Sequence, residues 1–202
     1  MKKKDPTGKR PYRMQARAQS TAATKEKVLD SAEAALDEHP GEEPTLSAIA
    51  DRAGVTVQTI LRHFGSKQAL LVAAIGRLGA RMRSDRDRAP VGDVKGAVGI
   101  LVDHYETYGD RILRMLANEG KDPVLHVLVD LGRAYHQEWC EHVFAPALTG
   151  LHAAKRERRI SQLVAITDIY FWKLLRRDRD LSLPQTKRAM RELLDPLIEG
   201  DR

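Results

Sequence analysis

Two short stretches with helical apolar spacing, joined by a glycine, occupy residues 45–64 (TLSAIADRAGVTVQTILRHF) and constrain the fold more than any other feature. In the first stretch, apolar residues at offsets of zero, three, four and seven share one helix face, which must pack against another element: Leu46, Ile49, Ala50 and Ala53. Thr45 stands where an N-cap is expected. Gly54 ends this helix, because glycine takes the left-handed conformation without a Cβ penalty.

The second stretch predicts a helix with an outward polar face. Thr56 is its N-cap candidate, and Ile60 and Phe64, four residues apart, face inward. The side chains left outside belong to Val57, Gln58, Thr59 and His63. Amides and hydroxyls near a helix N-terminus suit the major groove of DNA, where they read base edges. The pattern therefore predicts a helix-turn-helix.

The flanking residues extend this prediction. Gly65 ends the second helix, Ser66 can cap the next, and Lys67 beside helix N-terminal amides suits a phosphate. Residues 24–38 form an amphipathic helix through Val28, Leu29, Ala32, Ala35 and Leu36. Any helical hairpin with a glycine turn has similar capping and packing, but three such helices make a minimal DNA-binding domain.

The segments VLDSAEAAL, TLSAIADRAGV, RHF and SKQAL, between Val28 and Leu70, closely resemble the N-terminal domain of TetR-family transcriptional regulators. Residues 163–182, LVAITDIYFWKLLRRDRDLS, look like the dimer-forming helix common in the C-terminal halves of that family. The resemblance implies an all-α protein. A three-helix helix-turn-helix DNA-binding domain would be followed by a helical bundle that binds a ligand and dimerises.

The resemblance also implies which residues contact a double-stranded, palindromic DNA operator. They are Thr45, Ser47, Thr56, Val57, Gln58, Thr59, Leu61, His63 and Lys67. Leu61 departs from the family pattern, which has an aromatic residue there, most often a tyrosine that touches the DNA backbone. Leucine cannot donate that hydrogen bond, so we expect Arg62 beside it or the N-terminal tail to compensate.

The basic charge of the chain is concentrated at its N-terminus. Residues 1–20 hold seven basic residues and one acidic residue, which accounts for the whole net charge of +6, since the other 182 residues have 27 of each sign. With Pro6, Gly8 and Pro11 and few apolar residues, this segment is expected to be a disordered arm. Its predicted contacts to phosphates or the minor groove come from Lys9, Arg10, Arg13 and Arg17. The alternative is a solvated leader that only aids solubility.

Composition excludes several other classes of protein. The 202 residues are 42% hydrophobic, which supports a globular fold. The longest apolar run, residues 69–75, is far shorter than the roughly 20 residues that a bilayer requires, and the N-terminus has no apolar signal segment. One cysteine, Cys140, excludes an internal disulfide and fits a reducing compartment. We therefore expect a soluble, cytoplasmic protein without membrane contact.

The rest of the chain predicts further helices. One runs from Ser66 to about Arg83, and the polar stretch 84–93 marks a domain boundary near residue 88. Helical patterns follow near 94–108, 110–118, 123–145, 155–177 and 185–199. The predicted organisation is an arm (1–20), a DNA-binding domain (21–65), a connecting helix and linker (66–88) and an effector-binding and dimerisation domain (89–202).

Two of these helices have apolar faces broader than one internal contact needs. Their expected homodimer residues are Leu163, Thr167, Tyr170, Leu174, Met190, Leu194 and Leu197. Two helices from each subunit would form a four-helix interface about a two-fold axis. Half-sites roughly 34 to 36 Å apart follow from that symmetry. The alternative is that both helices complete a monomeric core.

The resemblance, and not the periodicity, suggests a small-molecule pocket in the bundle. Its candidate lining is Leu101, Tyr105, Tyr108, Met115, Leu128, Leu131, Tyr135, Trp139 and Phe144. An effector there would shift the helix from Ser66 to Arg83 and weaken operator binding by about 5- to 150-fold. Repression relieved by a ligand is the expected sign, although activation stays open, as does the alternative that the apolar stripe is only core.

Other chemistries have weaker support. His136 and Cys140 lie four residues apart, as do Glu138 and His142, but no third metal ligand is fixed nearby. We therefore expect no metal and no cofactor. A glycine-rich phosphate loop, a nucleophile elbow and an HExxH sequence are absent from the chain, which argues against an enzyme. The remaining alternatives are a non-specific architectural DNA-binding protein and a metal-responsive regulator.

Overall fold

The structure is a computed structural model that describes residues 9–38, 43–121 and 123–199. All regular secondary structure within these ranges is helical. The chain divides into two compact units, Met1–Ala80 and Arg81–Arg202. The division lies inside one helix, α4 (Lys67–Arg86), whereas the sequence placed the boundary in the polar stretch after it. No helix in the described ranges has the length and apolar composition needed to cross a bilayer.

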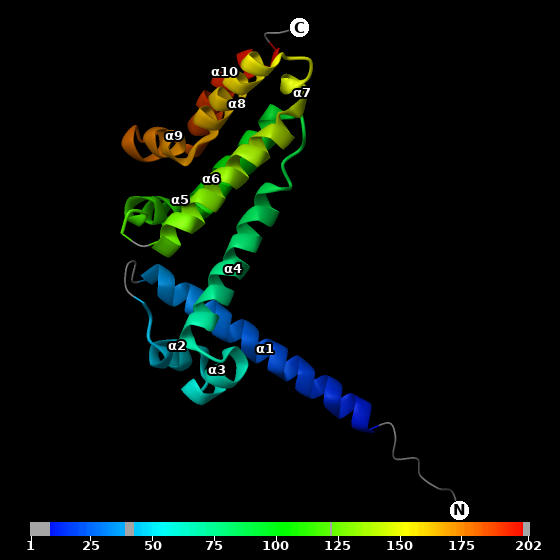
Figure 1. Cartoon of the computed structure of the whole chain (residues 1–202), viewed down its shortest axis with the longest axis vertical. Helices are drawn as coiled ribbons and strands as arrows, with labels where there is room; N and C mark the ends of the chain where they lie inside the picture. Colours follow the sequence, from blue (N-terminus) through cyan, green and yellow to red (C-terminus); the bar gives the residue numbers. More distant parts are fainter. Residues whose placement is uncertain (1–8, 39–42, 122, 200–202) are drawn as a thin grey trace, which may run out of the picture. The chain divides into compact units, whose positions relative to one another are not determined.

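The first unit contains α1 (Lys9–Glu38), α2 (Leu46–Ala53), α3 (Val57–Phe64) and the first part of α4 (Figure 1). All four helices contribute side chains to one small apolar core. Its members without exposed surface are Val28, Ala32, Ile49, Ile60, Leu70 and Ala74. The apolar positions predicted for the three-helix domain therefore pack together.

The first helix is longer than the sequence suggested. It begins at Lys9 rather than near Thr24, so the prediction of a disordered arm is wrong for residues 9–20, while residues 1–8 lie outside the described part. Residues 12–38 contain neither glycine nor proline and are rich in alanine, which favours a helix. Pro11 lies in the first turn, where its missing N–H breaks no helical hydrogen bond.

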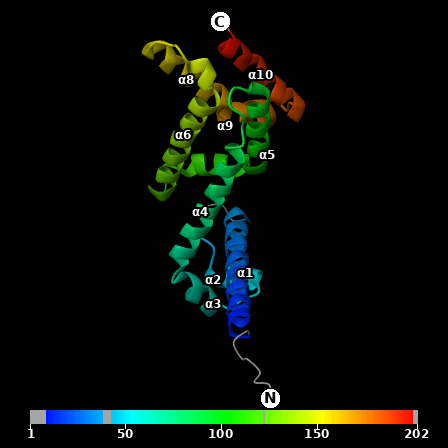
Figure 2. The same ribbon diagram turned by 90° about the vertical axis from the view of Figure 1, so that its right-hand side faces the viewer.

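The second unit is a helical bundle (Figure 2). After the end of α4 it contains α5 (Val94–Asn118), α6 (Pro123–Val143), α7 (Ala145–Leu148), α8 (Ala153–Thr167), α9 (Ile169–Lys173), a π-helical turn η1 (Leu174–Asp178) and α10 (Leu183–Glu199). Helix α5 packs against α6, α9 and α10, and α6 also packs against α8. The core contains Leu101, Val102, Phe144, Leu163, Trp172, Met190 and Leu194, each at most 2% exposed.

Three predicted helices differ from those observed. The patterns at 94–108 and 110–118 belong to one helix, because Gly109 does not end it. A Cβ at Gly109 would lie 2.7 Å from ring atoms of Trp172, so the glycine provides room for that ring. The single helix predicted over 155–177 is interrupted at Asp168, which has extended backbone (φ −68°, ψ 151°) and whose carboxylate accepts the N–H of Tyr170 at 2.8 Å. A side-chain cap therefore starts α9 separately.

Candidate nucleic-acid interface

The turn between α2 and α3 is fixed by its own residues. Thr45 caps α2 by accepting the N–H of Ala48 at 3.2 Å. Gly54 at the other end has φ +65°, in the left-handed region. The N–H of Val55 donates to the carbonyl of Ala50 at 3.0 Å and closes the helix end. Local chemistry therefore sets the angle at which α3 leaves α2.

Helix α3 is capped and anchored in the same way. The hydroxyl oxygen of Thr56 accepts the N–H of Thr59 at 3.1 Å and lies 3.0 Å from the Thr59 hydroxyl oxygen. Ile60 has no exposed surface and attaches the helix to the core of the first unit. Because the two threonine hydroxyls bond to each other, Gln58 offers the free amide on this face.

All ten predicted DNA-contact residues keep some exposed surface. Those classed as exposed are Thr45, Ser47, Thr56, Gln58 and Arg62. Those that are partly exposed are Val57, Thr59, Leu61, His63 and Lys67. They come from the start of α2, from α3 and from the start of α4. The structure thus gathers them within one unit, although their contacts to DNA remain a prediction.

Lys67 already has a carboxylate partner. Its Nζ lies 2.7 Å from Glu43 Oε2, and the Lys67 side chain is 27% exposed. Ser66 beside it caps α4 by accepting the N–H of Ala69 at 3.1 Å. A phosphate at this helix start would therefore compete with Glu43 for the lysine.

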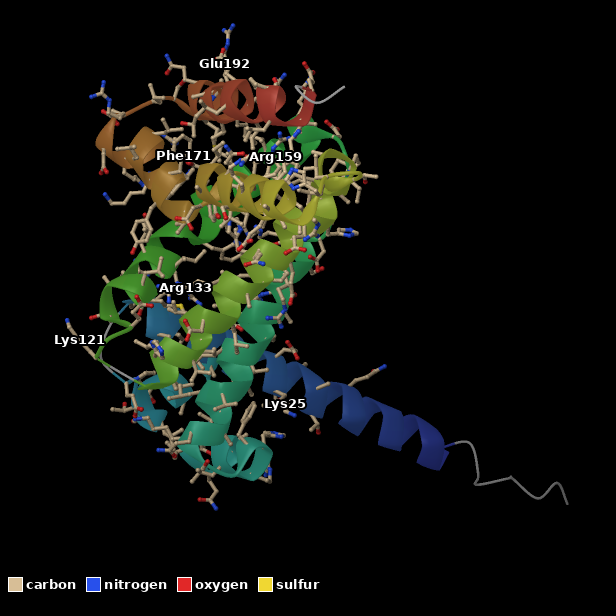
Figure 3. All side chains as sticks on the ribbon, turned by 45° about the horizontal axis from the view of Figure 1, so that its top comes forward. Lys25, Lys121, Arg133, Arg159, Phe171 and Glu192 are labelled. Atoms are coloured by element: carbon tan, nitrogen blue, oxygen red, sulfur yellow. The ribbon has the colours of Figure 1, made fainter. Side chains whose placement is uncertain are left out.

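One cation in this unit was not predicted from the sequence. Lys25 projects from α1 (Figure 3), and its Nζ lies 5.5 Å from the centroid of the Phe64 ring. Phe64 is the last residue of α3. This cation–π contact connects α1 to the end of the helix that carries Gln58.

A second unpredicted feature joins α1 to α4. The guanidinium of Arg77 pairs with three α1 carboxylates: Glu26 and Asp30 at 2.5 Å each, and Glu33 at 2.7 Å. Burial lowers the pKa of Arg77, but hydrogen bonds to these carboxylates outweigh it and raise the pKa above its ordinary value. The sequence did contain a signal, since spacings of four and three place the carboxylates on one face of a helix.

Residues 28–74, which include α2, α3 and part of α4, match the family model described as bacterial regulatory proteins, tetR family. Over these residues the chain therefore carries the N-terminal domain of the TetR family. The HTH-type transcriptional repressor KstR of Mycobacterium tuberculosis is 39% identical over 67 residues, which are 33% of this chain and 30% of KstR. The match thus spans less than a third of that relative's length.

Solved structures extend the likeness in fold over both units of the chain. A transcriptional regulator from Rhodococcus sp. Rha1 has a TM-score of 0.61 at 15% identity, over 87% of this chain and 96% of that one. A regulator from Streptomyces coelicolor A3(2), SCO7518, has a TM-score of 0.54 at 17% identity, over 84% and 97% of the two chains. At these identities the likeness concerns the fold alone.

The predicted effector-pocket residues are divided between the interior and the surface of the second unit. Leu101, Tyr105, Trp139 and Phe144 are buried, and Tyr108, Met115, Leu128 and Tyr135 are partly exposed. Leu131 is 62% exposed, so of the candidate residues it is the one most open to solvent, and its role in a pocket stays a prediction. The Tyr105 hydroxyl donates to the carbonyl of Thr167 at 2.9 Å, and burial raises the pKa of Tyr105 above its usual range.

Four of the predicted dimer residues are wrong for a physical reason. A side chain without exposed surface in one chain cannot contact a second copy, and this applies to Leu163, Thr167, Met190 and Leu194. These four side chains lie in the interior of the second unit instead. Tyr170 and Leu174 are 54% and 47% exposed, and Leu197 is partly buried. Leu193, on the same apolar face of α10, is 48% exposed.

The His136 and Cys140 pair forms a buried hydrogen-bonded group. The Cys140 sulfur lies 3.2 Å from the Thr167 hydroxyl oxygen and 3.9 Å from His136 Nε2. Burial raises the pKa of Cys140 to about 11, so the thiol stays protonated and is a poor metal ligand. Glu138 and His142 are exposed. Within the described ranges, no three or more His, Cys, Asp or Glu side chains gather as a metal site would require.

The proposed contacts of the basic N-terminal segment are not tested by the structure. Lys9, Arg10, Arg13 and Arg17 lie in the first turns of α1, and their side chains lie outside the described part. A helix, unlike a disordered arm, holds such residues on a surface with a repeat of 3.6 residues. Their binding to phosphates or to a minor groove stays a prediction.

Proposed function

We propose that this chain is a sequence-specific DNA-binding regulator of the TetR type, a homodimeric repressor that leaves a palindromic operator when a small molecule binds its second unit. One observation carries the proposal. Helix α3 is capped at Thr56 and anchored by buried Ile60, and it leaves the Gln58 amide exposed near its N-terminus. A rigid helix with a free amide at that position suits the major groove.

The residues around Gln58 support different contacts. An amide can pair with adenine through both its donor and its acceptor, so Gln58 is the proposed base reader. Arg62 is exposed on the same helix and is the proposed phosphate ligand in place of the hydrogen bond that Leu61 cannot make. Thr45 and Ser47, both exposed at the start of α2, are further proposed backbone contacts.

Dimerisation is proposed from the exposed apolar side chains of the second unit. Tyr170, Leu174 and Leu193 come from α9, η1 and α10, and each is between 47% and 54% exposed. Burial of such side chains against a second copy is favourable, at about 25 cal/mol for each Å² of apolar surface. Two recognition helices related by a two-fold axis would then read the two halves of a palindrome.

Selection of bound duplexes from a random pool, followed by competition with a scrambled duplex at the same salt concentration, tests this function. We expect Gln58→Ala to reduce the preference for the selected duplex by about 1 to 3 kcal/mol, or roughly tenfold to hundredfold. The matched control is Gln162→Ala, at an exposed position on α8, which should keep the full preference.

Two outcomes would contradict the proposal. Undiminished discrimination by Gln58→Ala would show that α3 does not read bases. Equal affinity of the unaltered chain for the selected and scrambled duplexes would favour the non-specific architectural alternative, since a regulator prefers its site by about a thousandfold or more.

A further inference from the structure

A buried arginine occupies the last turn of α4, inside the second unit. Arg86 is 5% exposed, although the guanidinium is permanently charged. Charged groups are rarely buried unless a group of opposite charge compensates them, because desolvation of an ion is costly. The surroundings of Arg86 therefore show what this position is suited to bind.

The hydrogen-bond partner of Arg86 is a neutral histidine. Arg86 Nη2 lies 2.8 Å from His136 Nδ1. Because a guanidinium only donates, Nδ1 must accept, and the ring proton is then on Nε2, which faces the Thr167 hydroxyl oxygen at 3.2 Å. Burial, followed by the charge of Arg86, lowers the pKa of His136 to about 3. His136 thus orients the arginine without neutralising it.

The other contacts of Arg86 also leave its charge uncompensated. The guanidinium lies 4.5 Å from the Trp139 ring centroid and 5.3 Å from that of Tyr135. Its Nε is buried and has no hydrogen-bond partner. In the part of the chain that the structure describes, no carboxylate forms an ion pair with it. The aromatic rings thus cover the guanidinium, while Nε remains available to an acceptor.

The nearest acidic residues in sequence are used elsewhere. The carboxylate of Asp85 accepts the Tyr108 hydroxyl at 3.1 Å, and that of Asp87 accepts the Tyr135 hydroxyl at 2.7 Å. Neither carboxylate is buried beside Arg86, since Asp85 is partly exposed and Asp87 is exposed. Among residues 9–38, 43–121 and 123–199, the chain therefore supplies no carboxylate ion pair to Arg86.

A second unpartnered polar atom belongs to the same cluster. His104 on α5 is 5% exposed, and its Nδ1 is buried without a hydrogen-bond partner. Its ring lies 5.0 Å from that of Tyr108 and 5.6 Å from that of Tyr105, measured between centroids. Burial, then the charges of Arg86 and His136, lower the pKa of His104 to about 3. Two buried donors or acceptors without partners in one cluster are unusual in a folded protein.

We propose that the effector of this protein is a small organic acid whose carboxylate pairs with Arg86. This inference rests on the proposed function for the existence of an effector and adds its chemical class. A carboxylate accepts two hydrogen bonds from a guanidinium edge, and such charge-assisted bonds are stronger than the bond to neutral His136. The apolar part of the acid would contact the aromatic rings of this cluster.

The position of Arg86 connects binding to α4. The same helix begins at Lys67, directly after the recognition helix and its glycine, and ends at Arg86. An anion bound at Arg86 would act on the last turn of this helix and compete with His136 for Nη2. The effector would thus change a contact between α4 and α6 within the second unit.

Calorimetric titration of the full-length chain, without DNA, tests the chemical class. The probes are octanoate and phenylacetate, each compared with its uncharged amide, octanamide or phenylacetamide, at millimolar concentration. We expect an acid to bind and its amide to bind about tenfold to hundredfold more weakly, as for loss of a charged hydrogen bond. Arg86→Gln should weaken binding of the acid by a similar factor, and Arg86→Lys should weaken it by less. Arg83→Gln, at an exposed position one turn earlier, is the control for net charge.

Thermal unfolding of the same variants separates a binding arginine from a structural one. Removal of an uncompensated buried charge should leave the Tm of Arg86→Gln unchanged or raised. A large fall in Tm, equal binding of acid and amide, binding of neither acid, or full acid binding by Arg86→Gln would each overturn the inference. Because no readout involves DNA, failure of the proposed regulatory function would appear only in the duplex-selection experiment.

Discussion

Arg77 and Arg86 lie nine residues apart on α4 and have opposite surroundings. Arg77 faces three carboxylates of α1, more negative charge than one guanidinium can neutralise. Arg86 faces aromatic rings and a neutral histidine, and in the described ranges it has no carboxylate partner. The charge of Arg77 is thus neutralised by α1 carboxylates, whereas the charge of Arg86 is not neutralised by any carboxylate in the described ranges.

The comparison shows why residue type alone does not assign a function. Both side chains are positively charged, and both lie on one helix. Arg77 is 19% exposed at the edge of the first unit, where several partners hold it. Arg86 is buried in the second unit, where the cost of a charge without a counter-ion is much larger. The first arrangement favours stability and the second favours ligand binding.

Acid should destabilise the Arg86 region most strongly. The folded-state pKa values of His104 and His136 are about 3, below the ordinary value of 6.5, so only the unfolded chain takes up these protons as the pH falls below that value. Each histidine then costs up to about 1.4 kcal/mol per pH unit, or about 4 kcal/mol for both between about pH 7 and about pH 5. Urea unfolding followed by tryptophan fluorescence measures this, because both tryptophans lie in the second unit.

His104→Gln should remove about half of that pH dependence. The matched control is His126→Gln, since His126 is 59% exposed and should not contribute in this way. If the free energy of unfolding of the second unit were equal at both pH values, the inference that both buried histidines are neutral in the folded chain would be wrong. Arg86→Gln should make the dependence shallower, because the charge of Arg86 lowers both pKa values.

Loss of Arg77 should be the next largest effect. Arg77→Gln leaves the Glu33 side chain, only 9% exposed, beside two other carboxylates without their shared cation. We expect the first unit to lose about 2 to 4 kcal/mol of unfolding free energy. Far-ultraviolet circular dichroism should then show a helical transition at lower urea than the tryptophan transition of the second unit.

The controls for Arg77 use its own partners. Arg77→Lys keeps the charge but cannot reach three carboxylates with a fixed planar group, so its loss should be smaller. Glu26→Gln should cost least, because Glu26 is 63% exposed. An Arg77→Gln chain whose helical transition is unchanged would mean that the three ion pairs contribute nothing to stability, as often holds for exposed pairs.

Local chemistry explains which parts of the fold were predictable. The end of α2, the caps at Thr45 and Thr56 and the buried position of Ile60 follow from residues within a few positions of each other. The sequence therefore predicted the α2–α3 region closely. The acidic face of α1 was also readable, although its partner Arg77, more than forty residues away, was not.

Long-range packing explains what was not predictable. The broad apolar faces near Leu163 and Met190 look the same whether they meet a second copy or the core, and burial decided for the core. Gly109 resembled a helix end because the Trp172 ring that needs its space is distant in sequence. Nothing local distinguishes Arg86 from the exposed arginines beside it in sequence, Arg83 and Arg88.

The smallest expected effect concerns Thr167, whose hydroxyl lies beside His136 Nε2. Thr167→Val removes the hydroxyl that faces His136 Nε2 and should cost about 1 to 2 kcal/mol in the tryptophan transition. If Thr167 supports Arg86 through the histidine, the effects of Thr167→Val and Arg86→Gln should be non-additive in a double-mutant cycle. Thr186→Val is the matched control, because the hydroxyl of this buried threonine donates to the Ser182 carbonyl at the start of its own helix. Its effect should add to that of Arg86→Gln. Additivity in both cycles would mean that Arg86 is oriented independently of the Thr167 hydroxyl. Arg86 would then differ from Arg77 only in having no carboxylate partner among the described residues.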